Sequence, residues 1–404
     1  MPDPQGGLMD AVTTEGLPLH GIRVVEFVHM VMGPTCGLVL ADLGADVVKV
    51  EPAPDGDNTR RLGGSGAGFF AICNRNKRSL AVDVKTPAGH ALVRKLLATA
   101  DVVIENFRPG AMDKLGFGYS ALSAANPRLI YCSCKGFLDG PYDHRTALDE
   151  VVQMMGGLAY MTGPPGRPLR AGSSVNDIMG GMFGAIGILA ALNQRHATGR
   201  GRLVQSALFE NNAVLVAQHM AQYAVTGEEA RPMPDRRAAW PIYDIFDVAD
   251  GQVFVGVVTD TQWKVFCAAF DARALAADPR LTNQPDRLAA RPWTVPLVAD
   301  IFRPYARQAL MDKCEALGLP FAPIARPVDL FDDPHLNASG GLVPTTLPDG
   351  TRTKLPALPI SLDGARLPKR RDPPAPGQHD DEIARELGLD DAAIAALRTE
   401  GVIV

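Results

Sequence analysis

A strand–helix–strand pattern near the N-terminus constrains the fold of this chain more than any other feature. Residues 22–27 (IRVVEF) and 46–51 (DVVKVE) are short apolar runs typical of buried strands. Residues 35–43 between them have the pattern of a helix, which ends at Gly44. Two strands joined in this way lie parallel in one sheet with a right-handed crossover. The sequence therefore predicts a parallel sheet that includes these two strands.

The alternation of helix and strand continues to about residue 135. A helical pattern at 87–100 is followed by strand patterns at 101–107 and 129–133, which predicts an α/β fold with a doubly wound sheet. Glu51, at the end of the second strand, would suit the ribose of a dinucleotide. NAD binding is nevertheless disfavoured, because the loop after the first strand (HMVMGP) lacks the glycines of GxGxxG that let a backbone approach a pyrophosphate.

A second, smaller domain is predicted in the middle of the 404-residue chain. The composition changes at 226–240, where a polar stretch with two prolines is typical of a linker. The pattern at 241–258 predicts a hairpin, and helical patterns follow it at 261–270 and 291–317. We therefore expect an α+β domain at 226–325.

Composition narrows the class of protein. A net charge of −5 argues against non-specific nucleic-acid binding. The six cysteines are scattered and form no CxxC pair, so we expect neither a metal site nor a disulfide framework. Residues 1–18 lack the basic and apolar segments of a signal peptide, and the apolar run after Asp177 is short and rich in glycine for a membrane span. We expect a cytoplasmic protein with no nucleic-acid or membrane partner.

Asp177 is the first candidate catalytic residue. It opens a charge-free run within 170–192 whose apolar residues recur at spacings of three and four, which predicts a buried helix. Ser173, Ser174 or Asn176 would cap this helix, and its glycines predict close backbone packing. The helix dipole favours an ionised carboxylate at the N-terminus, which suits a nucleophile. On these residues alone, a helix cap is the alternative role for Asp177.

A cluster of bases forms a second candidate site in the predicted loop at 55–79. Arginine and lysine together suit phosphate groups, so an anion site is one interpretation and a solvated charged face is the other. The bases are Arg60, Arg61, Arg75, Lys77 and Arg78. Asn106, Arg108 and Lys135 fall at predicted strand ends, where doubly wound sheets bind their ligands.

The chain resembles the family III CoA-transferases, the CaiB/BaiF family. The resemblance rests on several stretches in the same order as in that family. They are LPLHGIRVVEF, GPTCGLVLADLGADVVKVEP, NRNKRSLAVDVK, DVVIENFRPGAMDKLGFGY, the Asp177 helix with TGRGRLVQSAL, and ELGLDDAAIAALRTEGVI. They run from about residue 18 to the C-terminus, so they cover nearly the whole chain.

The resemblance implies a fold, an assembly and a set of site residues. It implies a Rossmann-like large domain built from residues 1–225 and 326–404 around the small domain, and a homodimer whose chains interlock like rings. Asp177 would be the nucleophile, with backbone N–H groups near its helix start holding the oxyanions, and no cofactor would be needed beyond coenzyme A as a substrate. The implied CoA-binding residues are Arg75, Asn76, Lys77, Arg78, Asn106, Phe107, Arg108 and Lys135.

The resemblance also bears on the substrate. Residues 143–172 are most similar to the branch of mesaconyl-CoA C1–C4 and succinyl-CoA dicarboxylate CoA-transferases. A small dicarboxylic acid is then the expected partner of the acyl-CoA. Its implied contacts are His29, Val31, Arg145 and Arg170, with His144 a weaker candidate. For Arg170 a salt bridge on a loop is the alternative role.

Two departures from family patterns separate this chain from other members. Members that act on formyl-CoA have a glutamine where Val31 stands and a glycine run where this chain has RRAAWPIYD. Racemases of 2-methylacyl-CoA pair the aspartate with a histidine where Leu148 stands. Racemisation needs a second acid/base, which leucine cannot provide. A racemase or epimerase is therefore the alternative function and is disfavoured.

Overall fold

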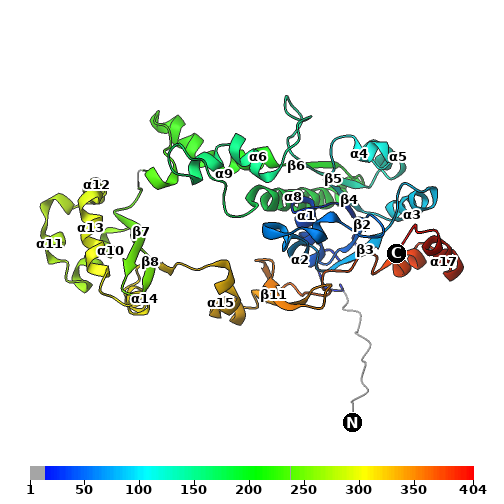
Figure 1. Cartoon of the computed structure of the whole chain (residues 1–404). Coiled ribbons are helices and arrows are strands. Elements are labelled where there is room, and N and C mark those ends of the chain that lie inside the picture. The colour runs from blue at the N-terminus through cyan, green and yellow to red at the C-terminus, as the bar shows by residue number, and fades with distance from the viewer. Residues whose placement is uncertain (1–13, 237) are drawn as a thin grey trace, which may run out of the picture. The chain divides into compact units, whose positions relative to one another are not determined.

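The computed structural model describes residues 14–236 and 238–404. The chain forms two compact units. One comprises the described residues up to Pro234 together with Pro334–Val404, and the other is Asp235–Asp333. The N-terminal strands and the C-terminal helices thus belong to the same unit, where the red helix α17 lies beside the blue and cyan elements (Figure 1).

The first unit is built on a six-stranded sheet in which every described pair of neighbours is parallel. The strand order is β3-β2-β1-β4-β5-β6, so the order reverses between β1 and β4. The predicted α/β class and parallel sheet are confirmed. The strands are β1 (Arg23–Phe27), β2 (Asp46–Glu51), β3 (Lys77–Ala81), β4 (Val102–Glu105), β5 (Ile130–Lys135) and β6 (Leu203–Ala207).

Helices and small hairpins complete this unit. The helices are α1 (Met32–Asp42), α2 (Phe69–Cys73), α3 (Pro87–Ala98), α4 (Ala111–Lys114), α5 (Tyr119–Ala125), α6 (Asp149–Met155), α7 (Leu158–Thr162), α8 (Val175–Thr198), α9 (Leu208–Thr226), α15 (Pro334–Ala338), α16 (Asp380–Glu386) and α17 (Asp391–Thr399). Two antiparallel hairpins pair β10 (Leu342–Thr346) with β11 (Arg352–Pro356), and β12 (Ser361–Leu362) with β13 (Ala365–Arg366).

Alternating residues of the strands contribute their side chains to two hydrophobic cores, one on each face of the sheet. Along β5, Cys132 and Cys134 face the core shared with α1 and α8, whereas Tyr131, directly before Cys132, faces the core shared with α3, α16 and α17. Successive side chains of a strand point to opposite faces, so one strand serves both layers. The sheet is therefore covered on both faces, as a parallel sheet requires.

Helix α8 packs directly on α1 through its glycines. A Cβ built on Gly181 would lie 2.5 Å from the carbonyl oxygen of Met32, and one on Gly180 would lie 2.5 Å from the Met32 side chain. The predicted close backbone packing is confirmed, and it fixes the start of α8 near the start of α1. By length and composition α8 is also the one described helix that could cross a membrane. Core helices of soluble proteins pass the same test.

The predicted loop at 55–79 is largely structured. It contains the short helices η1 (Asn58–Arg61), η2 (Gly64–Gly66) and α2, and Lys77 already belongs to strand β3. The C-terminal segment then packs on β3: the N–H of Ala81 donates to Asp380 at 2.9 Å, and Val82 forms a bridge with Ile403. Both ends of the chain thus contribute to this side of the sheet.

The second unit has its own core between an antiparallel sheet and helices. The predicted hairpin is β7 (Ile242–Val248) and β8 (Gly251–Val257), to which β9 (Phe321–Pro323) adds a third strand. Aromatic residues dominate the core, with Phe266 and Phe302 fully buried. The helices are α10 (Asp260–Ala269), α11 (Arg273–Ala277), α12 (Gln284–Ala289), α13 (Arg291–Phe302) and α14 (Arg307–Ala316).

Candidate active site

The reversal of strand order between β1 and β4 brings three predicted site residues together. Asn106, directly after β4, accepts the His29 N–H at 3.0 Å and donates to the His29 carbonyl at 2.8 Å. The His29 and Phe107 rings have centroids 5.7 Å apart. Ligands of doubly wound sheets bind at such switch points, beyond the carboxyl ends of the strands. Burial lowers the pKa of His29, so its ring is neutral at pH 7 and offers a hydrogen bond rather than a charge.

A carboxylate from another helix caps the start of α8. Buried Asp149, the first residue of α6, accepts the N–H of Asn176 at 2.8 Å and of Asp177 at 3.2 Å. Ser174, one of the three predicted cap residues, is the N-cap residue of α8, but its side chain makes no capping hydrogen bond. A cap supplied across the fold cannot be recognised from local sequence. From sequence alone, Asp149 and Glu150 in the first turn of α6 are interpreted as acids that stabilise α6 itself.

The first-turn N–H groups of α8 all have protein acceptors. Besides the two bonds to Asp149, the N–H of Val175 donates to the Ser173 carbonyl, and the N–H of Ile178 donates to the Ser174 carbonyl. These four groups are therefore engaged within the protein, and oxyanion binding by other backbone N–H groups near the helix start stays a prediction. The helix dipole still acts on Asp177, which lies in the first turn of a 24-residue helix.

Asp177 has the electrostatic properties of a reactive group. Its side chain is partly buried, and its pKa is raised to about 7. Burial is the largest cause and the Asp149 charge is the next, while the Arg170 guanidinium opposes both. Groups with a pKa close to the working pH are typical of active sites. Asp177 can exist at neutral pH as either a carboxylate or a neutral acid.

The loop before α8 is tied to α6. The Arg170 guanidinium pairs with Glu150 and lies 3.7 Å from Asp149, while Gln153 accepts the Ala171 N–H at 2.8 Å and donates to Asp149. The salt bridge considered for Arg170 is therefore present. It also keeps a positive charge close enough to Asp177 to favour its ionised form.

Comparison with known proteins identifies the family. The sequence profile described as CoA-transferase family III matches residues 19–380. The chain is 34% identical to a succinate–glutarate CoA-transferase of Agrobacterium fabrum, covering 92% of this chain and 96% of that protein. It is likewise 34% identical to a succinyl-CoA:mesaconate CoA-transferase of Haloarcula hispanica, with the same two coverages. The crystal structure of a CAIB/BAIF family protein from Brucella suis matches with a TM-score of 0.81 at 35% identity, covering 92% of this chain and 99% of that one.

The chain belongs to CoA-transferase family III. It is therefore an enzyme that exchanges CoA between an acyl-CoA and a carboxylic acid. The predicted membership of the CaiB/BaiF family is confirmed.

In this CoA-transferase, cations follow the carboxyl ends of strands β3, β4 and β5, of which β4 and β5 are neighbours in the sheet. Arg108 is exposed after β4, and Lys135 ends β5 with its ammonium group 2.9 Å from Asp139. Sequence reasoning missed two others, Lys85 after β3 and Lys114 in α4, both of which are exposed. For Lys85 the available signal was its position soon after the end of β3 at Ala81, whereas Lys114 lies farther from its strand, at the end of α4.

The basic cluster at 75–78 lies at the opposite edge of the sheet. Lys77 and Arg78 begin β3 and pair in register with the first half of β2, at the amino ends of the strands. The Lys77 ammonium and the Glu26 carboxylate form a 2.7 Å ion pair in which both side chains are fully buried. The buried Arg78 guanidinium pairs with Asp46 at 2.6 Å and with acids of α16.

Arg75 and Asn76 are engaged in the same way. Arg75 pairs with Asp42 at 2.6 Å and donates to the Pro356 carbonyl, while Asn76 also donates to Asp42 and accepts the backbone N–H of Arg370. The phosphate-binding interpretation of residues 75–78 is therefore corrected. Their charges are used inside the fold, and we leave all four out of the proposed CoA site.

The two remaining predicted contacts, Val31 and Arg145, come from elements other than α8. Val31 is buried at the N-terminus of α1. Arg145 is exposed, with its guanidinium 4.2 Å from the centroid of the Tyr142 ring. Within the described residues, neither makes a hydrogen bond or ion pair with Asp177.

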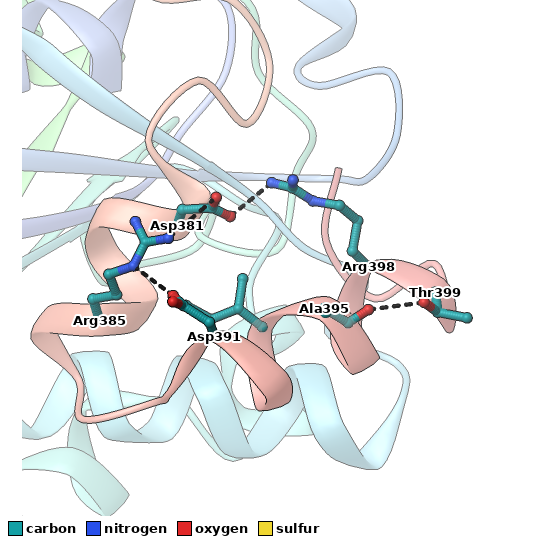
Figure 2. A pocket seen from close by; sticks show the side chains of 7 residues that line it. Asp381, Arg385, Asp391, Ala395, Arg398 and Thr399 are labelled. Carbon is teal, nitrogen blue, oxygen red and sulfur yellow. Dashed lines mark hydrogen bonds and ion pairs between the residues drawn. The ribbon is translucent and has the colours of Figure 1, made fainter.

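A surface pocket between α16 and α17 does not offer a second anion site (Figure 2). Its two guanidinium groups are already paired, Arg398 with Asp381 at 2.7 Å and Arg385 with Asp391 at 3.0 Å. Exposed, paired charges of this kind contribute little energy to binding or folding.

Proposed function

We propose that this enzyme transfers CoA between an acyl-CoA and a C4 or C5 dicarboxylic acid, with Asp177 as the covalent nucleophile. The observation that carries the proposal is the Asp177 carboxylate itself. It stands in the first turn of α8 with a pKa near neutrality, close to the start of α1 and the loop after β1. The names of the succinate–glutarate and succinyl-CoA:mesaconate relatives support a dicarboxylate.

The first half of the proposed reaction forms an enzyme–CoA thioester. An oxygen of the Asp177 carboxylate attacks the thioester carbonyl, the carbon–sulfur bond breaks, and the product pair is a mixed anhydride and CoA thiolate. The thiolate then attacks the aspartyl carbonyl. The anhydride carbon–oxygen bond breaks, and the first acid leaves as its carboxylate.

The second half repeats these steps in reverse with the acceptor. The acceptor carboxylate attacks the aspartyl thioester and expels CoA thiolate, which then attacks the acyl carbonyl of the new anhydride. Asp177 leaves as a free carboxylate. Charge and atoms balance without a proton donor, and the steps use no metal or redox cofactor. Dividing one exchange into steps of similar energy is what covalent catalysis provides.

Cations and rings at the carboxyl edge supply the proposed CoA site. Arg108 and Lys135 would bind phosphate oxygens, with Lys85 and Lys114 as further candidates at the same edge. Asn106 and Phe107 shape the switch point next to His29. Arg170 is the proposed partner of the distal carboxylate of the acid, since it is the described cation that already acts on Asp177.

The choice of acid tests the substrate class. Purified enzyme with succinyl-CoA should transfer CoA to mesaconate, glutarate, itaconate or malate, and fail with the monocarboxylates butyrate and valerate, which have the same chain lengths. The Arg170→Gln variant should lose preference for dicarboxylates, whereas Arg145→Gln serves as a matched control on a neighbouring loop. Transfer to monocarboxylates alone would contradict the dicarboxylate proposal while leaving CoA transfer intact.

We also propose that the active form is a homodimer with interlocked chains. Helices α6 to α9 expose many large apolar side chains, which monomeric proteins rarely leave in contact with water. Examples are Met154, Tyr160, Met182, Ile186, Met220 and Tyr223. Sedimentation equilibrium should give twice the chain mass, and a Met182→Glu/Ile186→Glu variant should weaken the assembly. A monodisperse monomer with full activity would contradict this proposal.

The racemase alternative has no observation in its favour. The residue before Asp149 is Leu148, which is exposed and carries no acid or base.

A further inference from the structure

Three buried cysteines lie directly beneath the helix that carries Asp177. Cys36 comes from α1, and Cys132 and Cys134 come from alternate positions of β5. Their three Sγ atoms lie within 4.8 Å of one another. Two of them share one face of a strand, because residues i and i+2 point the same way. The sequence contains no CxxC pair here, so spacing alone gave no sign of the cluster.

Helix α8 closes the cluster with a bare glycine. A Cβ built on Gly184 would lie 3.1 Å from the Cys36 Sγ, 3.4 Å from that of Cys132 and 3.6 Å from that of Cys134. The three sulfur atoms therefore surround the point that any larger residue would fill. Because Gly184 has no side chain, α8 leaves the position next to the three sulfur atoms unfilled.

We propose that Cys36, Cys132 and Cys134 are the three ligands of a site for a soft d¹⁰ metal ion, namely Cu(I). Thiolate sulfur selects soft ions of this class. Structural zinc prefers four ligands in a tetrahedron, and the cluster found among the described residues supplies three. All three sulfurs are buried, so water is not at hand as a fourth ligand.

Binding is a ligand exchange without electron transfer. Copper–sulfur bonds form as the chelator or thiol that delivers Cu(I) leaves, and each thiol that becomes a thiolate releases its proton to the buffer. The site is separate from the proposed transfer chemistry, since none of its residues takes part in an acyl-transfer step. It is linked to that chemistry only through α8, which contributes Gly184 to the site and Asp177 to the reaction.

Anaerobic competition against bicinchoninate, which reports Cu(I) by colour, tests the proposal. Wild-type enzyme should remove one Cu(I) per chain, and copper X-ray absorption should show a shell of sulfur neighbours only. Cys36→Ala should lower the affinity at least about tenfold, since lost ligands cost no less than lost outer contacts. Cys73→Ala is the matched control, because Cys73 is also buried next to α1 but outside the cluster. Circular dichroism would verify that both variants fold.

A second variant keeps all three thiols and changes only Gly184, the residue of α8 that lies against them. Gly184→Ala should reduce Cu(I) uptake, because its methyl group would crowd the Cys36 Sγ at 3.1 Å and contact the other two sulfur atoms. Equal affinity of Cys36→Ala and Cys73→Ala would overturn the proposal. Nitrogen or oxygen neighbours of copper in the X-ray absorption spectrum would overturn it as well. This second test uses the wild-type enzyme, so it does not depend on whether a variant folds. A mass loss of two hydrogens with no bound copper would instead identify a disulfide.

Discussion

The amino and carboxyl edges of the parallel sheet both carry clusters of charged residues, but the two clusters are built differently. At the amino edge the cations are buried and each has a carboxylate partner, as in Lys77 with Glu26 and Arg75 with Asp42. At the carboxyl edge Arg108 is exposed. Burial and the Asp149 charge raise the pKa of Asp177 there, and the Arg170 guanidinium offsets only part of that rise.

This difference teaches that partners, more than residue type, decide what a charge does. A buried ion pair that satisfies its hydrogen bonds fixes two segments relative to each other and has no capacity left for a ligand. The amino-edge cations fix α1 and the C-terminal segment against β3. A charged group without a full set of partners can still interact with a substrate, and groups of this kind are typical of functional sites.

The largest expected effect is at the carboxyl edge. Asp177→Asn should lower the rate of CoA transfer at least about 10⁴-fold, as loss of a nucleophile does in other covalent enzymes. The variant should still bind acyl-CoA, but mass spectrometry after mixing should find no enzyme–CoA thioester. Turnover near that of wild type would remove Asp177 from the mechanism.

The same change should not destabilise the fold. The pKa of Asp177 is raised in the folded state, so its contribution to stability is present below the unfolded pKa and is lost as pH rises through about 7. At pH 8 the asparagine variant should therefore have a Tm equal to or above that of wild type. A lower Tm at pH 8 would mean that Asp177 has a structural role.

The amino edge should show the opposite behaviour. Lys77→Met leaves the Glu26 carboxylate buried without its cation and should reduce the free energy of unfolding by about 3–5 kcal/mol. The double variant Glu26→Leu/Lys77→Met should recover much of that loss, because it removes both charges. Chemical denaturation measures both. A KM for acyl-CoA that rises in Lys77→Met without loss of stability would return Lys77 to the CoA site.

The parts of this contrast that the sequence could predict are those with local or periodic signals. Strands such as 46–51 and the glycine packing of α8 follow from patterns of 2.0 and 3.6 residues, and Asn106 was placed by its strand end. The pairing of Arg75 with Asp42 and the capping of α8 by Asp149 could not be predicted. Both join segments far apart in the sequence, and only the tertiary fold decides which charges meet.

A matched pair of arginines compares the two edges directly. Arg108→Gln should raise the KM for acyl-CoA about tenfold through loss of a phosphate contact, with Tm unchanged. Arg78→Gln should lower Tm, because it breaks the ion pairs to Asp46 and α16, and should leave KM unchanged in the folded enzyme. Steady-state kinetics and thermal melts give the KM for acyl-CoA and the Tm of each variant. The same response of both variants would abolish the distinction between the edges.

The smallest effect concerns the tuning of Asp177 by its neighbours. Since the carboxylate form attacks, kcat/KM should fall about tenfold per pH unit below a pKa near 7. The negative charge of Asp149 raises that pKa and the positive charge of Arg170 lowers it. Asp149→Asn should therefore move the acid limb to lower pH, and Arg170→Gln should move it to higher pH, each by about one unit or less. The opposite signs separate this tuning from the titration of CoA itself, which is common to all three enzymes. Shifts of the same sign would mean that the limb reports another group, and that the charges around α8 act on folding as those of the amino edge do.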